Sequence, residues 1–408
     1  MATEKTTSFN GLPQELADNI LLRLPVKALI RSTSVNKKWY SLITNPNFIS
    51  AQIKNSISHC DDNLVLIVPC LISEEKHCSL ISVETSELVE KFEVPFTTRS
   101  DYWILVNSVD GLMLLTGITV FNRTTTHLYL WNPCLKTYRI LVSSCFEKVL
   151  GDRERFYLVG LGFNKVSNVY RVVRIVYFQD KMDLPKVEVY SLRERTWKEI
   201  KDPVVPRRSL RDCEGVYVNG RIYWMEVERS FSVESSPYVS KDLRMLSFDF
   251  DTEVFGEVKV PEEVSNCLGV GAGFKLMEFD GSLALCVCNI QVRNGLFIIP
   301  YRIWLMRLDN GVISWILRFT NELKEPGLVM NITKTGTILV QRLPSLPVHA
   351  ITRIFSCNLN TMHYKDLGLG GRWGEEDFPT MPHCIVDTSF IESLVMYEGG
   401  KSLLKFSK

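Results

Sequence analysis

The spacing of apolar residues changes once along this chain, near Asn63, and the change divides the chain into two kinds of structure. Before that point apolar residues recur every three or four positions, which is typical of helices that bury one face. After it, runs rich in Val, Ile, Tyr, Phe and Trp alternate with polar residues and are broken by Asn-Gly and Asp-Gly pairs, which is typical of strands joined by tight turns. We therefore expect a mainly β protein with a small helical module in front.

The helical part has signals for three short helices. Pro13 suits a first helical turn and Pro25 lies just past the other end, so one helix is expected from about Pro13 to Leu24. A second is expected over Val26–Arg31, and a third from an N-cap at Ser34. Three such helices cannot bury all their apolar surface among themselves, so another surface has to cover the remainder.

The β part repeats a unit of four strands, in which two strands around a tight turn are followed, after a variable loop, by two more. One copy runs from Glu214 to Val260, with Asn219-Gly220 at its first turn. The other copies span Tyr102–Val142, Leu158–Ile200, Ala272–Phe319 and Leu328–Leu367. Because a unit of two hairpins cannot cover its own apolar faces, we expect the units to stack around an axis as a closed β-propeller-like domain of four-stranded blades.

The two ends of the β part leave the number of blades open. Leu64–Val94 and Cys384–Tyr397 each look like an incomplete copy. If they share one blade the propeller has six blades, and if each forms its own blade it has seven. A pair of flat sheets is the alternative architecture, but it gives no reason for the strand order to repeat.

The run LPQELADNILLRLPVKALIRSTSVNKKWYSLITNPNFISAQI, from Leu12 to Ile53, resembles an F-box in its Leu-Pro, Leu-Pro-Val-Lys, Val-x-x-x-Trp and Asn-Pro-x-Phe elements. The family uses these helices to bind a Skp-type adaptor, which joins them to a cullin that carries a RING subunit and the ubiquitin-conjugating enzyme. The resemblance implies that the following residues contact the adaptor or hold the helices that do: Leu12, Pro13, Leu16, Ile20, Leu24, Pro25, Leu29, Val35 and Trp39. Many family members carry a cysteine shortly before the third helix, where Thr33 and Ser34 stand here, and this puts only the choice of adaptor isoform in doubt. The alternative is an ordinary helical cap whose apolar stripe packs on its own chain.

The strings YLWNPCLKTYRIL, VEVYSLRERTWKEI and GVYVNGRIYWM resemble the F-box-associated interaction domain of plant F-box proteins, a kelch-like propeller type. The similarity is best from Tyr102 to Asp309. It implies that the β domain binds a protein substrate of an SCF-type ubiquitin ligase, and it does not identify that substrate. We therefore expect a flexible N-terminus over residues 1–11, an F-box over 12–53, a linker over 54–62 and the substrate-binding domain over 63–408.

Composition argues against several other classes of protein. Forty-seven Lys and Arg oppose forty-six Asp and Glu, so no net field draws the chain to nucleic acid or anionic lipid. The longest apolar stretch, Leu64–Ile72, is interrupted by Pro69 and is too short to span a bilayer, and the polar start lacks a secretory signal pattern. Eleven cysteines without paired spacing fit a reducing compartment. We expect a cytoplasmic or nuclear protein with no membrane insertion.

The residues offer little support for enzymatic chemistry. Cys286 and Cys288 fall on one face of a strand as packing residues, and the His-Cys neighbours lack the spaced doublets of a zinc site. Asp249 and Asp251 straddle a hairpin turn, where solvated carboxylates are common. We expect no metal, no cofactor and no catalytic residue. The alternatives are a propeller hydrolase, with two carboxylates or a His and a nucleophile in its central channel, and an interaction scaffold that works without a ligase.

Substrate capture is expected on loops, which vary without loss of the fold. Three loops combine charge with aromatic or apolar residues: Pro206–Asp212, Arg229–Val239 and Gly370–Phe378. Such residues often anchor interfaces. The candidates within them are Arg207, Arg208, Arg211, Phe231, Tyr238, Arg372 and Trp373. Ordinary solvated loops are the alternative for each.

Overall fold

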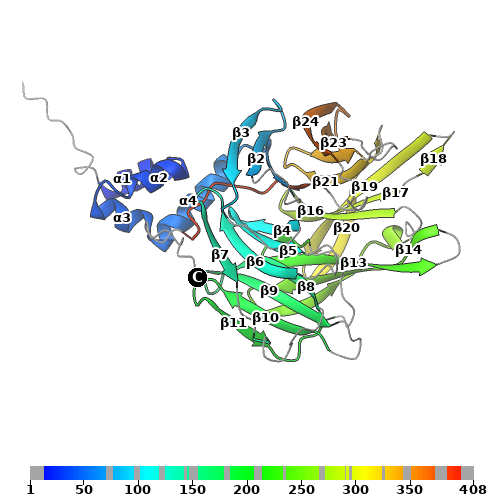
Figure 1. Ribbon diagram of the computed structural model, residues 1–408, viewed down its shortest axis with the longest axis horizontal. Coiled ribbons are helices and arrows are strands. Elements are labelled where there is room, and N and C mark those ends of the chain that lie inside the picture. Colours follow the sequence, from blue (N-terminus) through cyan, green and yellow to red (C-terminus); the bar gives the residue numbers. More distant parts are fainter. Residues whose placement is uncertain are drawn as a thin grey trace, which may run out of the picture.

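The computed structural model describes residues 13–69, 77–95, 102–118, 125–141, 145–146, 155–178, 184–205, 214–232, 236–265, 272–289, 291–293, 296–323, 327–342, 351–372 and 384–396. It begins with a helical module, residues 13–59, that stands at one end of a large β domain (Figure 1). Within the described part of the chain, no helix has the length and apolar character needed to cross a membrane. The two-part division expected from the apolar spacing is confirmed.

The helical module contains four helices, one more than expected. They are α1 (Gln14–Leu22), α2 (Val26–Ser32), α3 (Lys37–Ile43) and α4 (Pro46–His59). The sequence signals for α4 are Asn45, whose side chain accepts a hydrogen bond from Asn47 N at 2.8 Å, and Pro46 in the first turn. The helix continues through residues 54–59, which were expected to belong to a linker.

The expected N-cap of the third helix at Ser34 is wrong. Asn36 caps α3, because its extended backbone lets its side-chain oxygen accept the N–H of Trp39 at 2.9 Å. The hydroxyl of Ser34 instead donates to Arg31 O at 2.7 Å, just past the end of α2. A serine near a helix start therefore belongs here to the preceding turn.

The β domain consists of six antiparallel sheets, which we number as blades 1 to 6. Blade 1 contains β25 (Cys384–Asp387), β1 (Leu64–Pro69), β2 (His77–Ser82) and β3 (Leu88–Glu93). Blade 2 contains β4 (Tyr102–Val109), β5 (Leu112–Ile118), β6 (Thr125–Asn132) and β7 (Thr137–Leu141). Blade 3 contains β8 (Arg155–Asn164), β9 (Val169–Phe178), β10 (Lys186–Ser191) and β11 (Thr196–Ile200).

The other three blades follow in chain order. Blade 4 contains β12 (Val216–Val218), β13 (Arg221–Ser232), β14 (Ser236–Asp249) and β15 (Val254–Val258), and the short α6 (Glu262–Ser265) follows it. Blade 5 contains β16 (Ala272–Phe279), β17 (Ser282–Asn289), β18 (Gln291–Arg293), β19 (Leu296–Asp309) and β20 (Val312–Leu323). Blade 6 contains β21 (Gly327–Ile332), β22 (Thr337–Arg342), β23 (Ile351–Asn358) and β24 (Tyr364–Arg372).

The two ends of the β domain share blade 1, so the propeller has six blades. The last strand, β25, pairs antiparallel with the first, β1, and places Asp387 opposite Leu66 and Cys384 opposite Pro69. The innermost strand of each blade contacts the innermost strands of its two neighbours. The contacts run around the axis from β25 to β4, β8, β12, β16 and β21 and back to β25. The ring is closed, as the repeat predicted.

Each pair of neighbouring blades encloses an apolar cluster. Trp224, Phe248 and Phe250 are fully buried between blades 3 and 4, and Tyr301 is fully buried between blades 5 and 6. The cluster between blades 1 and 2 extends into the helical module. The blades thus cover one another's apolar faces, which no single four-stranded sheet can do for itself.

One face of the propeller carries tight turns, and we call it the tight-turn face. Asp110-Gly111, Asn219-Gly220 and Asp280-Gly281 join the first two strands of blades 2, 4 and 5, with both residues of each pair at positive φ. Asn219 Nδ2 donates to Gly281 O at 2.8 Å, which links blades 4 and 5. The Tyr170 hydroxyl donates to Asp110 Oδ2 at 2.8 Å, which links blades 3 and 2.

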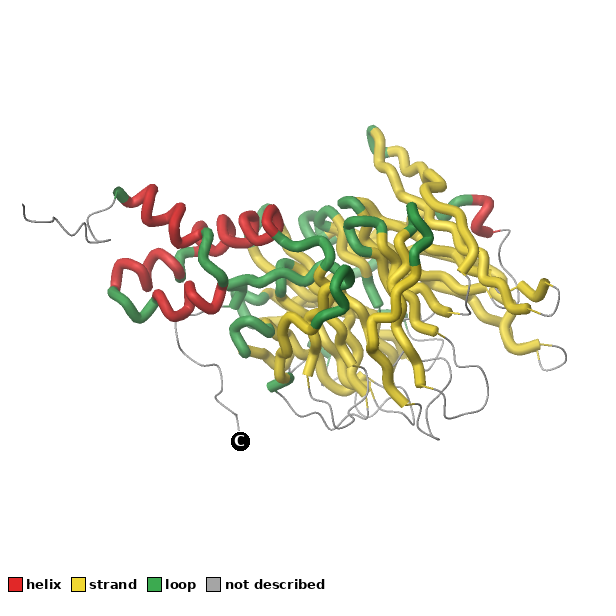
Figure 2. The backbone as a smooth tube through the Cα atoms, turned by 90° about the horizontal axis from the view of Figure 1, so that it is seen from above, coloured by secondary structure: helices red, strands yellow, loops and turns green. Residues whose placement is uncertain are grey.

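The helical module lies at the tight-turn face, because β1 begins and β25 ends there. Strands β11, β13 and β24 run away from that face and end at the opposite one, which we call the long-loop face. Figure 1 shows helices α1 to α4 at one end of the molecule and β14 and β18 at the other, and Figure 2 shows the same helical module at one end of the β domain. The two faces are therefore available to different partners.

Two Asp-Gly turns allow a matched test of the contact between blade 2 and the chain that follows β25. A Cβ on Gly111, at φ +76°, would lie 2.3 Å from Ile391 O, whereas one on Gly281, at φ +68°, would meet nothing within 4 Å. We expect Gly281→Ala to cost about 1–2 kcal/mol of stability from the left-handed backbone alone, and Gly111→Ala to cost about 2–5 kcal/mol because overpacking adds to it. Thermal and urea unfolding of both variants measure the difference, and equal losses would contradict the close approach.

Candidate functional site

Helix α1 has apolar residues on two sides, and only one side is covered by its own chain. Ala17 and Leu21 are buried, whereas the side chains of Leu16 and Ile20 are 51% and 43% exposed. Val35, between α2 and α3, is 60% exposed. Exposed apolar residues gathered on one small module are typical of a surface that another protein covers.

The residues implied by the F-box resemblance divide into an exposed set and a supporting set. Pro13, Leu16, Ile20, Pro25 and Val35 are exposed. Leu29 is fully buried, and Leu24 and Trp39 are partly buried and pack against the same cluster. Leu12 lies outside the described residues. The exposed set can meet a partner directly, and the supporting set holds the helices in place.

The buried side of the helical module is continuous with the propeller. Leu21, Leu29 and Phe48 belong to one apolar cluster with Phe92 of blade 1 and Leu394 near the end of the chain. The apolar surface that three helices could not bury is thus covered partly by α4 and partly by blades 1 and 2. The module is an extension of the propeller core and is not a separately packed domain.

The exposed part of the module is basic. Residues 13–59 contain six Lys and Arg against two Asp and Glu, a net charge of +4, whereas the whole chain carries +1. Lys27 forms an ion pair with Glu90 of β3, and the hydrogen bond in this pair raises the pKa of Lys27. Lys37 and Lys38 are exposed at the start of α3. A partner with acidic groups around an apolar centre would complement this surface.

The expected substrate residues fall partly on described strands and partly outside the described residues. Arg207, Arg208, Arg211 and Trp373 lie outside the described residues. Phe231 lies in β13, Tyr238 in β14 and Arg372 at the end of β24, and only their backbones are described. The described strands β11, β13 and β24, which precede or begin these segments, all end at the long-loop face.

The expectation that Arg229–Val239 forms a loop is wrong for most of that segment. Strands β13 and β14 continue beyond β12 and β15 of their own blade as a two-stranded ribbon, in which Arg229 pairs with Ser240 and Ser230 with Val239. The pairing is irregular between Glu228 and Arg229, where the strands accommodate a bulge. Polar composition suggested a loop, but alternation of Ser with Phe, Tyr and Val was the available signal for strands.

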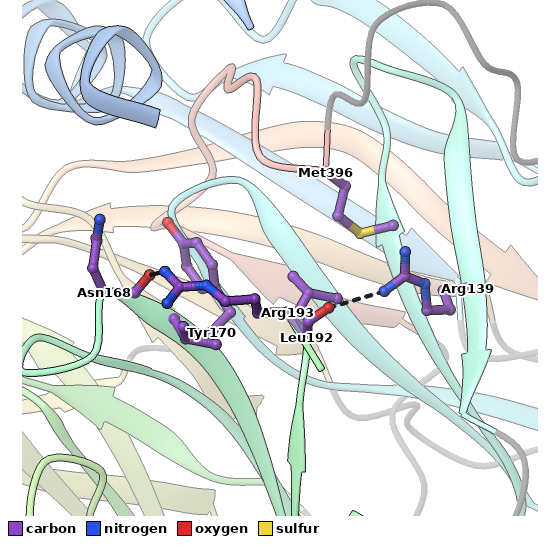
Figure 3. A pocket seen from close by; sticks show the side chains of 7 residues that line it. Arg139, Asn168, Tyr170, Leu192, Arg193 and Met396 are labelled. Carbon is purple, nitrogen blue, oxygen red and sulfur yellow. Dashed lines mark hydrogen bonds between the residues drawn. The ribbon is translucent and has the colours of Figure 1, made fainter. Parts of the chain in front are cut away.

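A cavity of about 180 Å³ opens between blades 2 and 3 at the tight-turn face (Figure 3). Arg139 of β7 donates through Nη1 to Leu192 O at 3.2 Å, and Arg193 donates through Nη2 to Asn168 O at 2.9 Å. Met396 closes one side. Because cavities for small-molecule ligands usually measure about 300–1,000 Å³ and both guanidinium groups hold carbonyl oxygens, the cavity is a packing feature between blades. Its residues come from separate turns and the chain end, so no sequence motif marks it.

Buried titratable side chains of the described residues serve the packing of blades. Glu188, fully buried in β10, pairs with Arg174 and accepts the backbone N–H of Cys145 at 2.9 Å. Cys286 is buried and Cys288 partly buried in β17, and burial raises the pKa of Cys288 to about 11, far from that of a reactive thiolate. Asp249 accepts from Asp251 N at 2.9 Å, as a turn residue does. Among the described residues no group of three or more His, Cys, Asp and Glu could hold a metal ion.

Comparison with known proteins gives two family matches. Residues 9–50 match the model of the F-box domain, and residues 68–343 match that of the F-box associated beta propeller domain. The chain is 27% identical to the F-box protein CPR1 of Arabidopsis thaliana, over 76% of this chain and 72% of the relative. It is 26% identical to the F-box/kelch-repeat protein At3g23880 of Arabidopsis thaliana, over 77% of this chain and 80% of the relative. A hypothetical selenium-binding protein from Sulfolobus tokodaii superposes with a TM-score of 0.40 at 10% identity, over 77% of this chain and 75% of that structure.

The division into exposed and supporting residues predicts different responses to the same kind of substitution. Leu29→Ala should destabilise the helical module by about 2–5 kcal/mol, because it leaves a cavity in the cluster shared with the propeller. Val35→Ala should change stability by no more than about 0.5 kcal/mol, because the side chain is exposed. Hydrogen exchange of α1 to α4 in the full chain measures both. Equal protection in the two variants would contradict the assignment of Leu29 to the core.

Proposed function

Since the chain belongs to the F-box associated beta propeller family and carries an F-box domain in front of its propeller, we propose that it is the substrate receptor of an SCF-type ubiquitin ligase. In this role the F-box binds a Skp-type adaptor, and through it a cullin and a RING subunit. The propeller binds a target protein. The chain contributes no catalytic residue to ubiquitin transfer and acts in the cytoplasm or the nucleus.

The observation that carries this proposal is the bare apolar side of the helical module. Leu16, Ile20 and Val35 remain exposed although the opposite side of the same helices is sealed against blades 1 and 2. Exposed apolar residues on an otherwise well-packed module lower solubility unless a partner covers them. A module that only capped the propeller would have no use for this second apolar side.

The two faces of the propeller support a division of labour. The F-box lies at the tight-turn face, and strands β11, β13 and β24, which precede or begin the candidate substrate segments, end at the long-loop face. A substrate on the long-loop face therefore does not compete for space with an adaptor on the F-box. Holding both at once brings a substrate lysine near the conjugating enzyme, and transfer gains from proximity rather than from a side chain of this chain.

Charged substitutions on the bare side should abolish adaptor binding while the propeller stays folded. The double variant Leu16→Asp, Ile20→Asp should weaken the Kd for a purified Skp-type adaptor about 100-fold or more, because two apolar anchors become charges that the adaptor surface has to desolvate. Val204→Asp is the matched control, since Val204 is an aliphatic residue of the propeller that is 86% exposed. Titration calorimetry gives the Kd values, and thermal unfolding checks the fold. Unchanged binding by the double variant would refute the docking assignment.

The same variant serves to identify the substrate better than a deletion of the F-box does. Removing residues 13–59 would expose Phe92 and Leu394 to solvent, because both pack in a cluster with the helices. Core residues exposed in this way bind other proteins non-specifically. With the proteasome blocked, we expect the intact chain to recover a cullin together with its substrate. The double variant should recover the substrate without the cullin. Recovery of equal amounts of cullin by both would contradict the proposed role of the F-box.

A further inference from the structure

Residues 388–396, which follow β25, lie between the F-box and the propeller (Figure 1). We call this segment the strap. Its side chains Phe390 and Leu394 are buried in the cluster that joins the helices to blades 1 and 2. The strap therefore contacts both parts of the molecule although it lies more than 300 positions after the F-box in the sequence.

The strap is fastened to blade 2 by its backbone. Asn132 is fully buried, and its Nδ2 donates to Ser393 O at 3.1 Å and to Val395 O at 2.8 Å. Gly111 approaches so closely that a Cβ there would lie 2.3 Å from Ile391 O. These contacts leave the strap little freedom to shift along the propeller.

On its other side the strap holds two helices of the F-box. Helix α2 begins after Pro25, which offers no side-chain cap, and the missing acceptor comes from Glu392, whose Oε2 accepts Val26 N at 3.1 Å. Gln52 of α4 is buried, donates through Nε2 to Glu392 O at 3.2 Å and accepts Leu394 N through Oε1 at 3.3 Å. Glu392 and Gln52 thus connect α2 and α4 to the strap, which Asn132 in turn holds on blade 2.

Apolar contact and hydrogen bonding contribute differently to this junction. The apolar cluster holds the F-box on the propeller, but hydrophobic contact has no preferred direction. Buried polar groups favour one geometry because any rotation leaves a donor or an acceptor unpaired. Gln52 is buried and Glu392 is partly buried, whereas another directional contact, the Lys27–Glu90 pair between α2 and β3, is exposed to solvent. The hydrogen bonds of Glu392 and Gln52 are therefore the stronger restraint on the orientation of the F-box.

We propose that Glu392 and Gln52 are positioning residues that set the angle between the F-box and the propeller. The inference rests on the proposed function, because that angle matters only if adaptor and substrate are held at once. Transfer by proximity requires the substrate to lie at a defined place relative to the conjugating enzyme. The strap thus makes the end of the chain a determinant of where on a substrate ubiquitin is attached.

The test is a distance distribution between the two parts of the full chain. Spin labels are placed at Asn19 of α1 and Lys198 of β11 as non-natural amino acids, since eleven cysteines rule out thiol labelling. We expect a single narrow distribution for the unmodified chain and for the control Glu257→Ala, which alters an exposed Glu of β15. The double variant Glu392→Ala, Gln52→Ala should broaden it about twofold or more, because the side-chain hydrogen bonds between the helices and the strap are gone and the exposed Lys27–Glu90 pair remains as a weak restraint. Gln52→Glu, which keeps the size of the side chain and removes its donor, should broaden it to a smaller degree.

Two further measurements separate positioning from folding. The propeller of the double variant should unfold at the temperature of the control. Its Kd for a Skp-type adaptor should change by no more than about twofold, because Leu16 and Ile20 lie on the exposed side of α1, whereas the substituted side chains bond to α2, α4 and the strap. A distribution that stays narrow in the double variant overturns the inference. The distance measurement needs no adaptor, so failure of the unmodified chain to bind an adaptor would overturn the proposed function alone.

Discussion

The pairing of β25 with β1 is the interaction on which the rest of the structure depends. Every blade relies on its two neighbours to cover its apolar faces, so an incomplete blade 1 would uncover blade 6 on one side and blade 2 on the other. The short ladder from Leu66–Asp387 to Pro69–Cys384 completes that blade from the two ends of the domain. It also brings the strap to the tight-turn face, where it meets the F-box. Ring closure and attachment of the helices are consequences of the same four-residue strand.

The F-box shows how a small module can be both anchored and available. Its helices carry apolar residues on two sides, and the chain covers one side with blades 1 and 2 while leaving Leu16, Ile20 and Val35 in solvent. Exposing them carries a cost that a monomeric protein normally avoids. The cost is tolerable because the buried side supplies the module with a core that three or four short helices could not build alone.

Local patterns predicted a large part of this fold, and contacts between distant segments account for the rest. The blades were visible because each repeats an alternating period around a turn such as Asn219-Gly220, whose geometry the residues themselves determine. The number of blades could not be predicted, because β25 and β1 lie far apart in the sequence and no repeat of the hydrophobic pattern relates them. Helix α4 carried a readable signal in Asn45 and Pro46, which was overlooked. The strap has no periodicity at all, and Glu392 acquires its partner in Val26 only through the folded propeller.

The division of blade 1 between the two chain ends has a consequence for synthesis. The F-box and β1 leave the ribosome before β25, so five blades can form while β1 still presents an unpaired inner edge. Only the arrival of residues 384–396 removes that edge and fixes the helices against blade 2. A translation product that stops short of this point would carry a poorly held helical module beside an open sheet edge. Chaperones and proteases recognise such edges, and β25 thereby acts as a check that the ring has closed.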